Sequence, residues 1–290
     1  MILPIFTTPS ELGDYLQSQR STSLAKPPLC GIGFVPTMGA LHLGHQSLID
    51  RARQENTLVI VSVFVNPLQF GASEDLDRYP RQLEIDRAIC EAAGVDALFV
   101  PSPDSMGIND ITQVIPPALM LSGLCGRTRT GHFQGVATIV VKLLNLVQPD
   151  RAYFGEKDAQ QLAIIRRIVT DLNIPVDIVG CPTVRAESGL ALSSRNQYLS
   201  PTGRSQAAVI YRSLQQAQIL ASAGEIEATS ILAAVKTELA TVPEFQLEYL
   251  ELVDRHTLQS IHTIDRSALI AIAGRLENTR LIDNIMIFDK

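Results

Sequence analysis

The sequence lacks paired cysteines. Its four cysteines, Cys30, Cys90, Cys125 and Cys181, are scattered over 290 residues and form no C-x-x-C pair. This spacing disfavours a disulfide framework or a zinc knuckle and fits reduced thiols in the cytoplasm. Cys30 and Cys181 adjoin apolar runs, and we expect them to be small core residues rather than reactive thiols.

The sequence also lacks a long apolar run and an excess of basic residues. No segment approaches the roughly 20 apolar residues that cross a bilayer, and residues 1–16 lack the pattern of a signal peptide. Lys and Arg number 24 against 30 Asp and Glu, a net charge of -6. We therefore expect a cytoplasmic protein that binds neither membrane nor nucleic acid, although local cations suffice for a small anionic substrate.

Strand-like and helix-like patterns alternate up to about residue 182. Helices are expected from Thr8 and over residues 45–55, 81–94, 135–147 and 158–173, and strands over 30–37, 57–67, 96–102, 151–155 and 176–182. This alternation predicts an α/β fold, a Rossmann-like doubly wound parallel sheet. In such sheets ligands bind beyond the carboxyl ends of the strands.

The pattern changes after residue 182. Helical stretches near 201–223 and 226–240 precede strands at 245–254 and 268–274, and in the first strand Phe245, Leu247 and Tyr249 alternate with Gln246 and Glu248. That alternation predicts a half-exposed antiparallel sheet in a smaller C-terminal α+β domain. We predict domains at 1–181 and 182–290. The Gly- and Pro-rich stretch 106–132 is expected to be a mobile surface loop.

The segment PTMGALHLGH, residues 36–45, follows the first long strand. His42 and His45 lie three residues apart at a predicted helix start, where unpaired N–H groups attract anions. Gly39 and Gly44 let a ligand approach the backbone. A metal site would need a third ligand, and a pair that only caps or packs is the structural alternative; the pattern favours phosphate binding.

Three further motifs follow strands or loops, and each is ambiguous by itself. NPLQF offers the amides of Asn66 and Gln69, although Asn-Pro also turns a chain. GEKD offers Lys157 and Asp158, although such a run is usually a solvated surface. SSRN offers hydroxyl groups and the bidentate guanidinium of Arg195 for phosphate oxygens, although this composition is also common in turns.

Together with GHFQGVATIV, these motifs resemble those of the pantothenate synthetase (pantoate–β-alanine ligase) family of HxGH nucleotidyltransferases. The resemblance extends from the first long strand to TRLIDN near residue 283. It implies that ATP activates pantoate as an acyl adenylate and that β-alanine then displaces AMP. It also implies a homodimer, ATP as co-substrate and Mg²⁺, for which the sequence shows no dedicated carboxylate cage.

The resemblance assigns roles to numbered positions. The implied ATP-binding residues are Met38, Gly39, Ala40, Leu41, His42, Leu43, Gly44, His45, Gly155, Glu156, Lys157, Asp158, Val184, Leu192, Ser193, Ser194 and Arg195. Among these, His45, His42, Lys157 and Arg195 are the expected catalytic residues. Gln69, Gln161 and Asn66 are expected to bind pantoate or β-alanine. The Asp158 carboxylate can either accept from ribose hydroxyls or help to hold Mg²⁺.

The chain departs from the family pattern at Leu43, Thr130 and Ala159, where acidic, proline and aromatic residues are usual. Because Thr130 replaces the usual proline, the sequence favours neither of two roles for Arg129, pyrophosphate binding and a solvated position on the surface. The rival interpretations are an HxGH enzyme that adenylylates a phosphate and stops, and a nucleotide-sensing module without turnover. A hinge near Pro182 is expected, because the Ser-Ser-Arg loop has to close over ATP.

Overall fold

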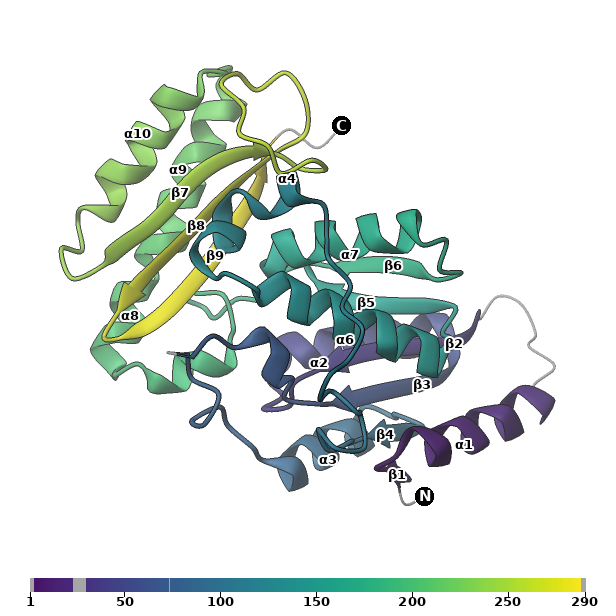
Figure 1. Cartoon of the computed structure of the whole chain (residues 1–290). Coiled ribbons are helices and arrows are strands. Elements are labelled where there is room, and N and C mark those ends of the chain that lie inside the picture. The colour runs from purple at the N-terminus through teal and green to yellow at the C-terminus, as the bar shows by residue number, and fades with distance from the viewer. Residues whose placement is uncertain (1–2, 23–29, 73, 288–290) are drawn as a thin grey trace. The chain divides into compact units, whose positions relative to one another are not determined.

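The computed structural model describes residues 3–22, 30–72 and 74–287. The chain divides into two compact units (Figure 1). The first comprises Met1–Pro116, Thr130–Glu156 and Ile164–Pro182, and the second comprises Pro117–Arg129, Lys157–Ala163 and Thr183–Lys290. The second unit thus includes two short segments that come from the predicted domain 1–181.

The first unit contains a six-stranded parallel sheet, which confirms the predicted doubly wound fold. Its strand order is β1-β4-β3-β2-β5-β6. The strands are β1 (Ile5–Phe6), β2 (Cys30–Thr37), β3 (Asn56–Val63), β4 (Ala97–Phe99), β5 (Arg151–Gly155) and β6 (Asp177–Cys181). In the register of the central strands, Phe34 of β2 pairs with Ile60 of β3 and with Ala152 of β5.

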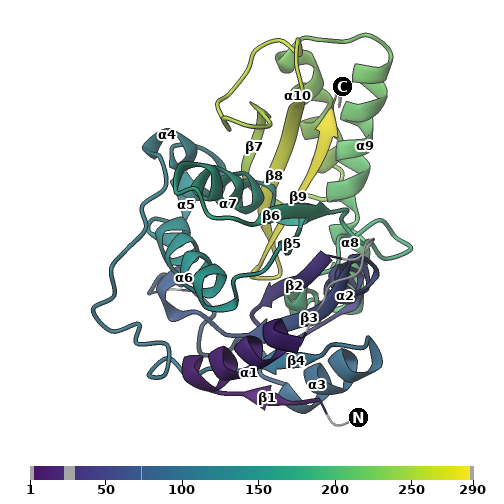
Figure 2. The same cartoon turned by 90° about the vertical axis from the view of Figure 1, so that its right-hand side faces the viewer.

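Helices cover both faces of this sheet (Figure 2). α1 (Pro9–Thr22), α6 (His132–Val147) and α7 (Ala159–Asp171) lie on one face, and α2 (Leu43–Glu55) and α3 (Leu83–Ala92) lie on the other. The chain leaves the adjacent strands β2 and β5 toward opposite faces, so the topological switch point lies between them. Ligands of open α/β sheets bind at that point.

Local sequence signals explain how several of these helices begin and pack. Thr8 Oγ1 accepts a hydrogen bond from Glu11 N–H at 3.3 Å, and the Glu11 carboxylate accepts from Thr8 N–H at 3.0 Å, so α1 starts in a capping box at the predicted Thr8. Leu48, Ile49 and Ala52 of α2 are buried in one cluster with residues of β2 and β3. The apolar stripe of α2 therefore faces the sheet, as its spacing predicts.

The second unit contains the antiparallel sheet β7 (Gln246–Asp254), β8 (Ala268–Leu276) and β9 (Thr279–Ile287). α9 (Val209–Ser222) and α10 (Ala228–Leu239) pack on it, and their buried side chains share one core with the strands. α8 (Pro201–Ala207) precedes α9, so the predicted helix 201–223 is two helices. The sequence did not predict β9.

The predicted exposure pattern of this sheet is wrong at two places. Leu247 was expected to face inward but is 40% exposed, because a bulge between Leu247 and Tyr249 shifts the alternation. β8 is buried along nearly its whole length instead of being half-exposed. The short helix α5 (Leu124–Thr128), which follows and contacts the short helix α4 (Ala118–Leu121), packs against β7 and β8.

The expectation of an irregular surface loop over 106–132 is therefore wrong for its second half. Met120, Leu124 and Cys125 are buried there, and His132 is the first residue of α6. Buried apolar side chains at 120, 124 and 125 secure this segment, and local composition does not reveal such long-range packing. In the described part of the chain, no helix combines the length and apolar character that crossing a bilayer requires.

Candidate active site

The turn after β2 is shaped by a buried carboxylate. Asp86 of α3 is 1% exposed, and its oxygens accept hydrogen bonds from the N–H groups of Ala40 at 2.9 Å and Leu41 at 2.7 Å. Gly39 and Ala40 both have positive φ angles, of 79° and 51°. A Cβ at Gly39 would meet Asp86 Oδ2 and Val63 Cγ1 at 2.9 Å, so the site requires glycine.

His42 and His45 form a reciprocal cap at the start of α2. His42 Nδ1 accepts from Gly44 N–H at 3.1 Å, and His45 Nδ1 accepts from His42 N–H at 3.4 Å. An imidazole whose Nδ1 accepts carries its proton on Nε2, so this cap selects the Nε2–H tautomer of both neutral rings. The ring centroids lie 4.1 Å apart, and both residues are half-buried. Each ring thus combines a capping nitrogen with a donor nitrogen.

Gln69 ends the short helix η1 (Pro67–Gln69), and Asn66 caps it. The Asn66 amide is 1% exposed; it accepts from Leu68 N–H and donates to Gln69 Oε1 at 3.0 Å and to Gly135 O at 3.1 Å. Gln69 Nε2 lies 3.1 Å from Met38 Sδ. The contacts of Asn66 are those of a turn residue, and substrate binding by Asn66 stays a prediction. Gln69 is half-buried beside the turn after β2.

α6 packs against η1 through a glycine. A Cβ at Gly135 would meet Leu68 O at 2.2 Å and Gln69 N at 2.6 Å. His132, one helical turn earlier, is 9% exposed, and its Nδ1 lies 2.9 Å from Gln69 O. Gly135 and His132 therefore fix the backbone that carries Gln69, which explains why the GHFQG motif accompanies NPLQF.

The GEKD motif follows β5. Gly155 and Glu156 belong to the first unit, and Lys157 and Asp158 belong to the second. Lys157 Nζ lies 3.8 Å from Asp158 Oδ2, with side chains 20% and 48% exposed. Asn284 of β9, which is 8% exposed, donates to Lys157 O at 2.8 Å. Lys157 is thus held by its backbone while its ammonium group remains partly exposed.

The other predicted nucleotide residues lie on a small hairpin that leads into the short helix η3 (Ser194–Tyr198). Leu192 N–H donates to Val184 O at 3.0 Å, and Ser193 Oγ accepts from Arg195 N–H at 3.3 Å. Arg185 holds the hairpin, because its guanidinium pairs with Asp283 of β9 and lies 3.8 Å from the Tyr211 ring centroid. Neighbouring residues of β9, Asp283 and Asn284, therefore anchor both the hairpin and Lys157.

Sequence reasoning did not identify Asp86, Asp283 or Asn284. Each is a buried polar residue within an element that otherwise reads as amphipathic helix or strand. A charged or amide residue on a buried face indicates a specific partner, but the sequence does not show which residue that partner is. Only the tertiary structure identifies the turns and hairpins that they hold.

Two of the cysteines, Cys90 and Cys181, are buried in the core of the first unit. Burial raises the pKa of the Cys90 thiol to about 12 and that of Cys181 to about 11, so both are protonated at neutral pH. Cys181 is 4% exposed, as predicted for a core residue, whereas the side chain of Cys30 lies outside the described residues. Over residues 3–22, 30–72 and 74–287, no three His, Cys, Asp or Glu side chains are grouped to hold a metal.

A comparison with known families and curated proteins gives one consistent result. The family model described as pantoate-beta-alanine ligase matches residues 4–286. A bifunctional pantoate ligase/cytidylate kinase of Trichormus variabilis is 59% identical over 266 residues, which cover 89% of this chain and 50% of the relative. That of Trichodesmium erythraeum is 50% identical over 296 residues, covering 98% of this chain and 56% of the relative. The chain thus spans about half the length of these relatives.

Solved structures agree over the whole chain. Pantothenate synthetase from Thermus thermophilus is 47% identical with a TM-score of 0.91, covering 99% of this chain and 100% of that one. Pantoate-beta-alanine ligase from Francisella tularensis, complexed with beta-gamma ATP and beta-alanine, is 35% identical with a TM-score of 0.79 and covers 98% and 97% of the two chains.

Proposed function

The chain belongs to the pantoate–β-alanine ligase family, and on this premise we propose that it joins (R)-pantoate to β-alanine in an ATP-dependent reaction. The observation that carries the proposal is the match of the family model to residues 4–286, within which the His42–His45 cap occupies the helix start after β2. The products are pantothenate, AMP and pyrophosphate.

The proposed reaction has two displacements. A carboxylate oxygen of pantoate attacks the α-phosphorus of ATP, the bond to the bridging oxygen breaks, and pyrophosphate leaves. The amine of β-alanine then attacks the acyl carbon, the bond from that carbon to the AMP oxygen breaks, and the amine loses a proton. Adenylation is needed because a carboxylate would otherwise have to expel oxide. The protein then has mainly to align the reactants and stabilise the charge on the phosphates.

We assign the phosphate contacts to groups whose geometry suits them. His45 and His42 present Nε2–H donors at a helix N-terminus, in the tautomer that their cap selects. Lys157 and Arg195 supply cations from the second unit. The other ATP contacts are assigned to the residues predicted from the sequence at 38–45, 155–158, 184 and 192–195.

Pantoate is assigned to the side-chain amides of Gln69 and Gln161, which offer a donor and an acceptor for a hydroxyl and a carboxylate. Within the described residues, the Gln161 side chain makes no hydrogen bond, and this residue is partly exposed. Asn66 would act indirectly, because its amide already bonds Leu68, Gln69 and Gly135. We propose the same kind of supporting role for Asp86.

Mg²⁺ is proposed to accompany ATP. The donor set fits an ion held largely by phosphates, because Asp158 offers one carboxylate that is 48% exposed next to Lys157. Asp158 is the residue that would hold the ion. When bound, Mg²⁺ would neutralise charge on the phosphate oxygens.

We also propose a homodimer, as the family resemblance implies, and a cytoplasmic location, as the cysteine pattern suggests. β6 is an edge strand of the parallel sheet and offers a surface that a second copy could cover. The free thiols Cys90, Cys125 and Cys181 suit a reducing compartment. Light scattering on a size-exclusion column should give twice the chain mass of 31.6 kDa; the chain mass itself would contradict the dimer.

A coupled assay with ATP, pantoate and β-alanine, each omitted in turn, tests the function. AMP and pantothenate should form only with all three substrates, and a bound adenylate should accumulate when β-alanine is left out. An enzyme that adenylylates a phosphate would release pyrophosphate only after a phosphate acceptor is added, and it would not require pantoate. A nucleotide-sensing module would bind ATP and release no product.

A further inference from the structure

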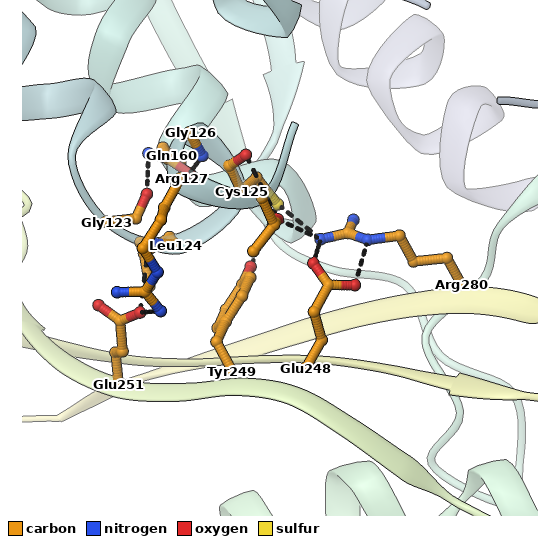
Figure 3. Close-up of polar contacts among 11 residues, drawn as sticks. Gly123, Leu124, Cys125, Gly126, Arg127, Gln160, Glu248, Tyr249, Glu251 and Arg280 are labelled. Atoms are coloured by element: carbon orange, nitrogen blue, oxygen red, sulfur yellow. Dashed lines mark hydrogen bonds and ion pairs between the residues drawn. The ribbon is translucent and has the colours of Figure 1, made fainter. Parts of the chain in front are cut away.

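Gln160 makes an unusual set of hydrogen bonds in the second unit. This residue is 6% exposed, and its side-chain oxygen accepts from Gly126 N–H at 3.2 Å. Its side-chain nitrogen donates to Met120 O at 2.9 Å and to Gly123 O at 3.1 Å. One amide at the start of α7 thus holds the backbone of the segment 117–129 at three points, and Figure 3 shows those at Gly123 and Gly126.

The turn held by Gln160 is a strained one. Leu124 has a φ of 52°, in the left-handed region that disfavours a γ-branched side chain. A Cβ at Gly126 would lie 2.4 Å from Leu121 O, so the two short helices pack backbone to backbone. Such a turn persists only when surrounding contacts determine it.

Side chains from the sheet hold the other side of the same segment. Glu251 Oε1 accepts from Leu124 N–H at 3.3 Å and from the Arg127 guanidinium at 2.7 Å. Cys125 Sγ lies 3.2 Å from Tyr249 Oη, and Arg280, paired with Glu248, reaches Cys125 and Thr128 (Figure 3). These contacts fix α5 on β7 and β9, whereas Gln160 links the turn to the helix start of α7.

We propose that Gln160 is a positioning residue for the reaction. It joins the segment 117–129, which ends at Arg129, to the chain that carries Lys157, Asp158 and Gln161, so that these groups form one rigid element. The Arg129 backbone completes the link, because its N–H donates to Cys125 O at 2.8 Å. The inference rests on the proposed ligase function, and it gives Arg129 the fixed geometry that binding pyrophosphate oxygens requires.

The test compares Gln160→Met with Gln161→Met. Methionine keeps the length of the side chain and removes its hydrogen bonds, and the neighbouring position supplies the matched control. In hydrogen–deuterium exchange, Gln160→Met should speed exchange of a peptide covering 117–129 at least fivefold and leave the β2 peptide unchanged. Gln161→Met should leave both peptides unchanged and raise the KM for pantoate.

Kinetics then separate positioning from mere folding. Gln160→Met should slow pyrophosphate release at least fivefold at saturating pantoate, and adding it to Arg129→Ala should cause no further loss. Unchanged exchange in 117–129 would overturn the clamp itself. Two results would overturn the positioning role. One is faster exchange in Gln160→Met with a normal rate of pyrophosphate release, and the other is a double variant whose two losses of rate multiply. A wild-type enzyme without ligase activity would overturn the proposed function, while the exchange data would still judge the clamp.

Discussion

Both imidazoles of the PTMGALHLGH segment use one ring nitrogen to cap a backbone N–H group. The sequence left phosphate binding and capping as alternatives; the structure shows the caps, and phosphate binding stays a proposal. Capping fixes the tautomer, and the tautomer places the proton on Nε2. Capping through Nδ1 and donation to a ligand from Nε2 would therefore use different nitrogens of the same ring.

This separation predicts different effects for two substitutions of His45. Glutamine at the third helical position can still accept from the His42 N–H as in a capping box, but it lacks the imidazole donor. His45→Gln should keep the wild-type stability and slow adenylation by about 10²-fold or more. His45→Ala should show the same rate loss and lower the free energy of unfolding by about 1 kcal/mol.

Urea denaturation and single-turnover pyrophosphate release measure the two effects. A near-normal rate for His45→Gln would show that the imidazole serves only as a cap. His42→Ala is the companion variant, because it removes the cap acceptor for Gly44 N–H.

Motifs supplied the candidate catalytic and binding side chains, since His, Lys, Arg and Gln are informative at a strand end. Supporting residues were less accessible to sequence reasoning. Asp86 accepts from the N–H of Leu41, which is 45 residues away in the sequence. Asn284 donates to the carbonyl of Lys157, which is 127 residues away. Nothing local marks such partners, because a side chain's role is set by whatever the fold brings to it.

Among elements, the strands of the parallel sheet were the most predictable. β2 and β5 have the bounds that their sequence patterns predict, because each is a buried run between turn signals. α4, α5 and β9 were missed for a common reason. They are secured by packing with distant segments, and short helices in particular are not stable by propensity alone.

The contact of α6 with η1 gives a prediction at Gly135. Gly135→Ala adds a methyl group that would overlap Leu68 O and Gln69 N, so the backbone of η1 must move. We expect a destabilisation of about 1–3 kcal/mol and a larger rise in the KM for pantoate than in the KM for ATP, because Gln69 moves with η1.

Gly13→Ala is the control for this change. Gly13 also lies within a helix, but nothing lies within 4 Å of an added Cβ. Alanine there should stabilise the protein by roughly 0.5–1 kcal/mol. Equal effects of the two substitutions in urea denaturation would contradict the packing of α6 against η1.

The ion pair that anchors α5 predicts a pH dependence of stability. Burial opposes ionisation of Glu248, but its hydrogen bonds with Arg280 and Thr128 and the charge of Arg280 lower its pKa below the ordinary 4.5. A lowered folded-state pKa stabilises the protein above the unfolded pKa, and this contribution is lost as the pH falls through the folded value. Glu248→Gln should remove this pH-dependent contribution to stability.

The urea midpoints of wild type and Glu248→Gln, measured from pH 7 to pH 3, test this linkage. The wild type should be more stable at pH 7, and the difference should shrink below about pH 4.5 as Glu248 is protonated. A difference that stays constant over this range would show that the Glu248 charge contributes nothing to the anchor.

In the chain as a whole, the proposed roles are divided between the two compact units. His42, His45 and Gln69 belong to the first, and Lys157, Gln161 and Arg195 belong to the second. The sequence predicted a parallel α/β fold followed by a smaller α+β fold with an antiparallel sheet. The change from strand–helix alternation to strands of alternating polarity is visible in the pattern. The sequence did not predict that residues 117–129 and 157–163 join the second unit, since that depends on Gln160 and the sheet.

Oxygen transfer from pantoate to AMP decides whether the chain acts through an acyl adenylate. Pantoate labelled with ¹⁸O in both carboxylate oxygens should yield AMP with one ¹⁸O atom, unlabelled pyrophosphate and pantothenate that keeps the other label. Label in inorganic phosphate with ADP as product, or AMP that carries no ¹⁸O, would contradict the adenylate and with it the roles assigned to His45, Lys157 and Arg195.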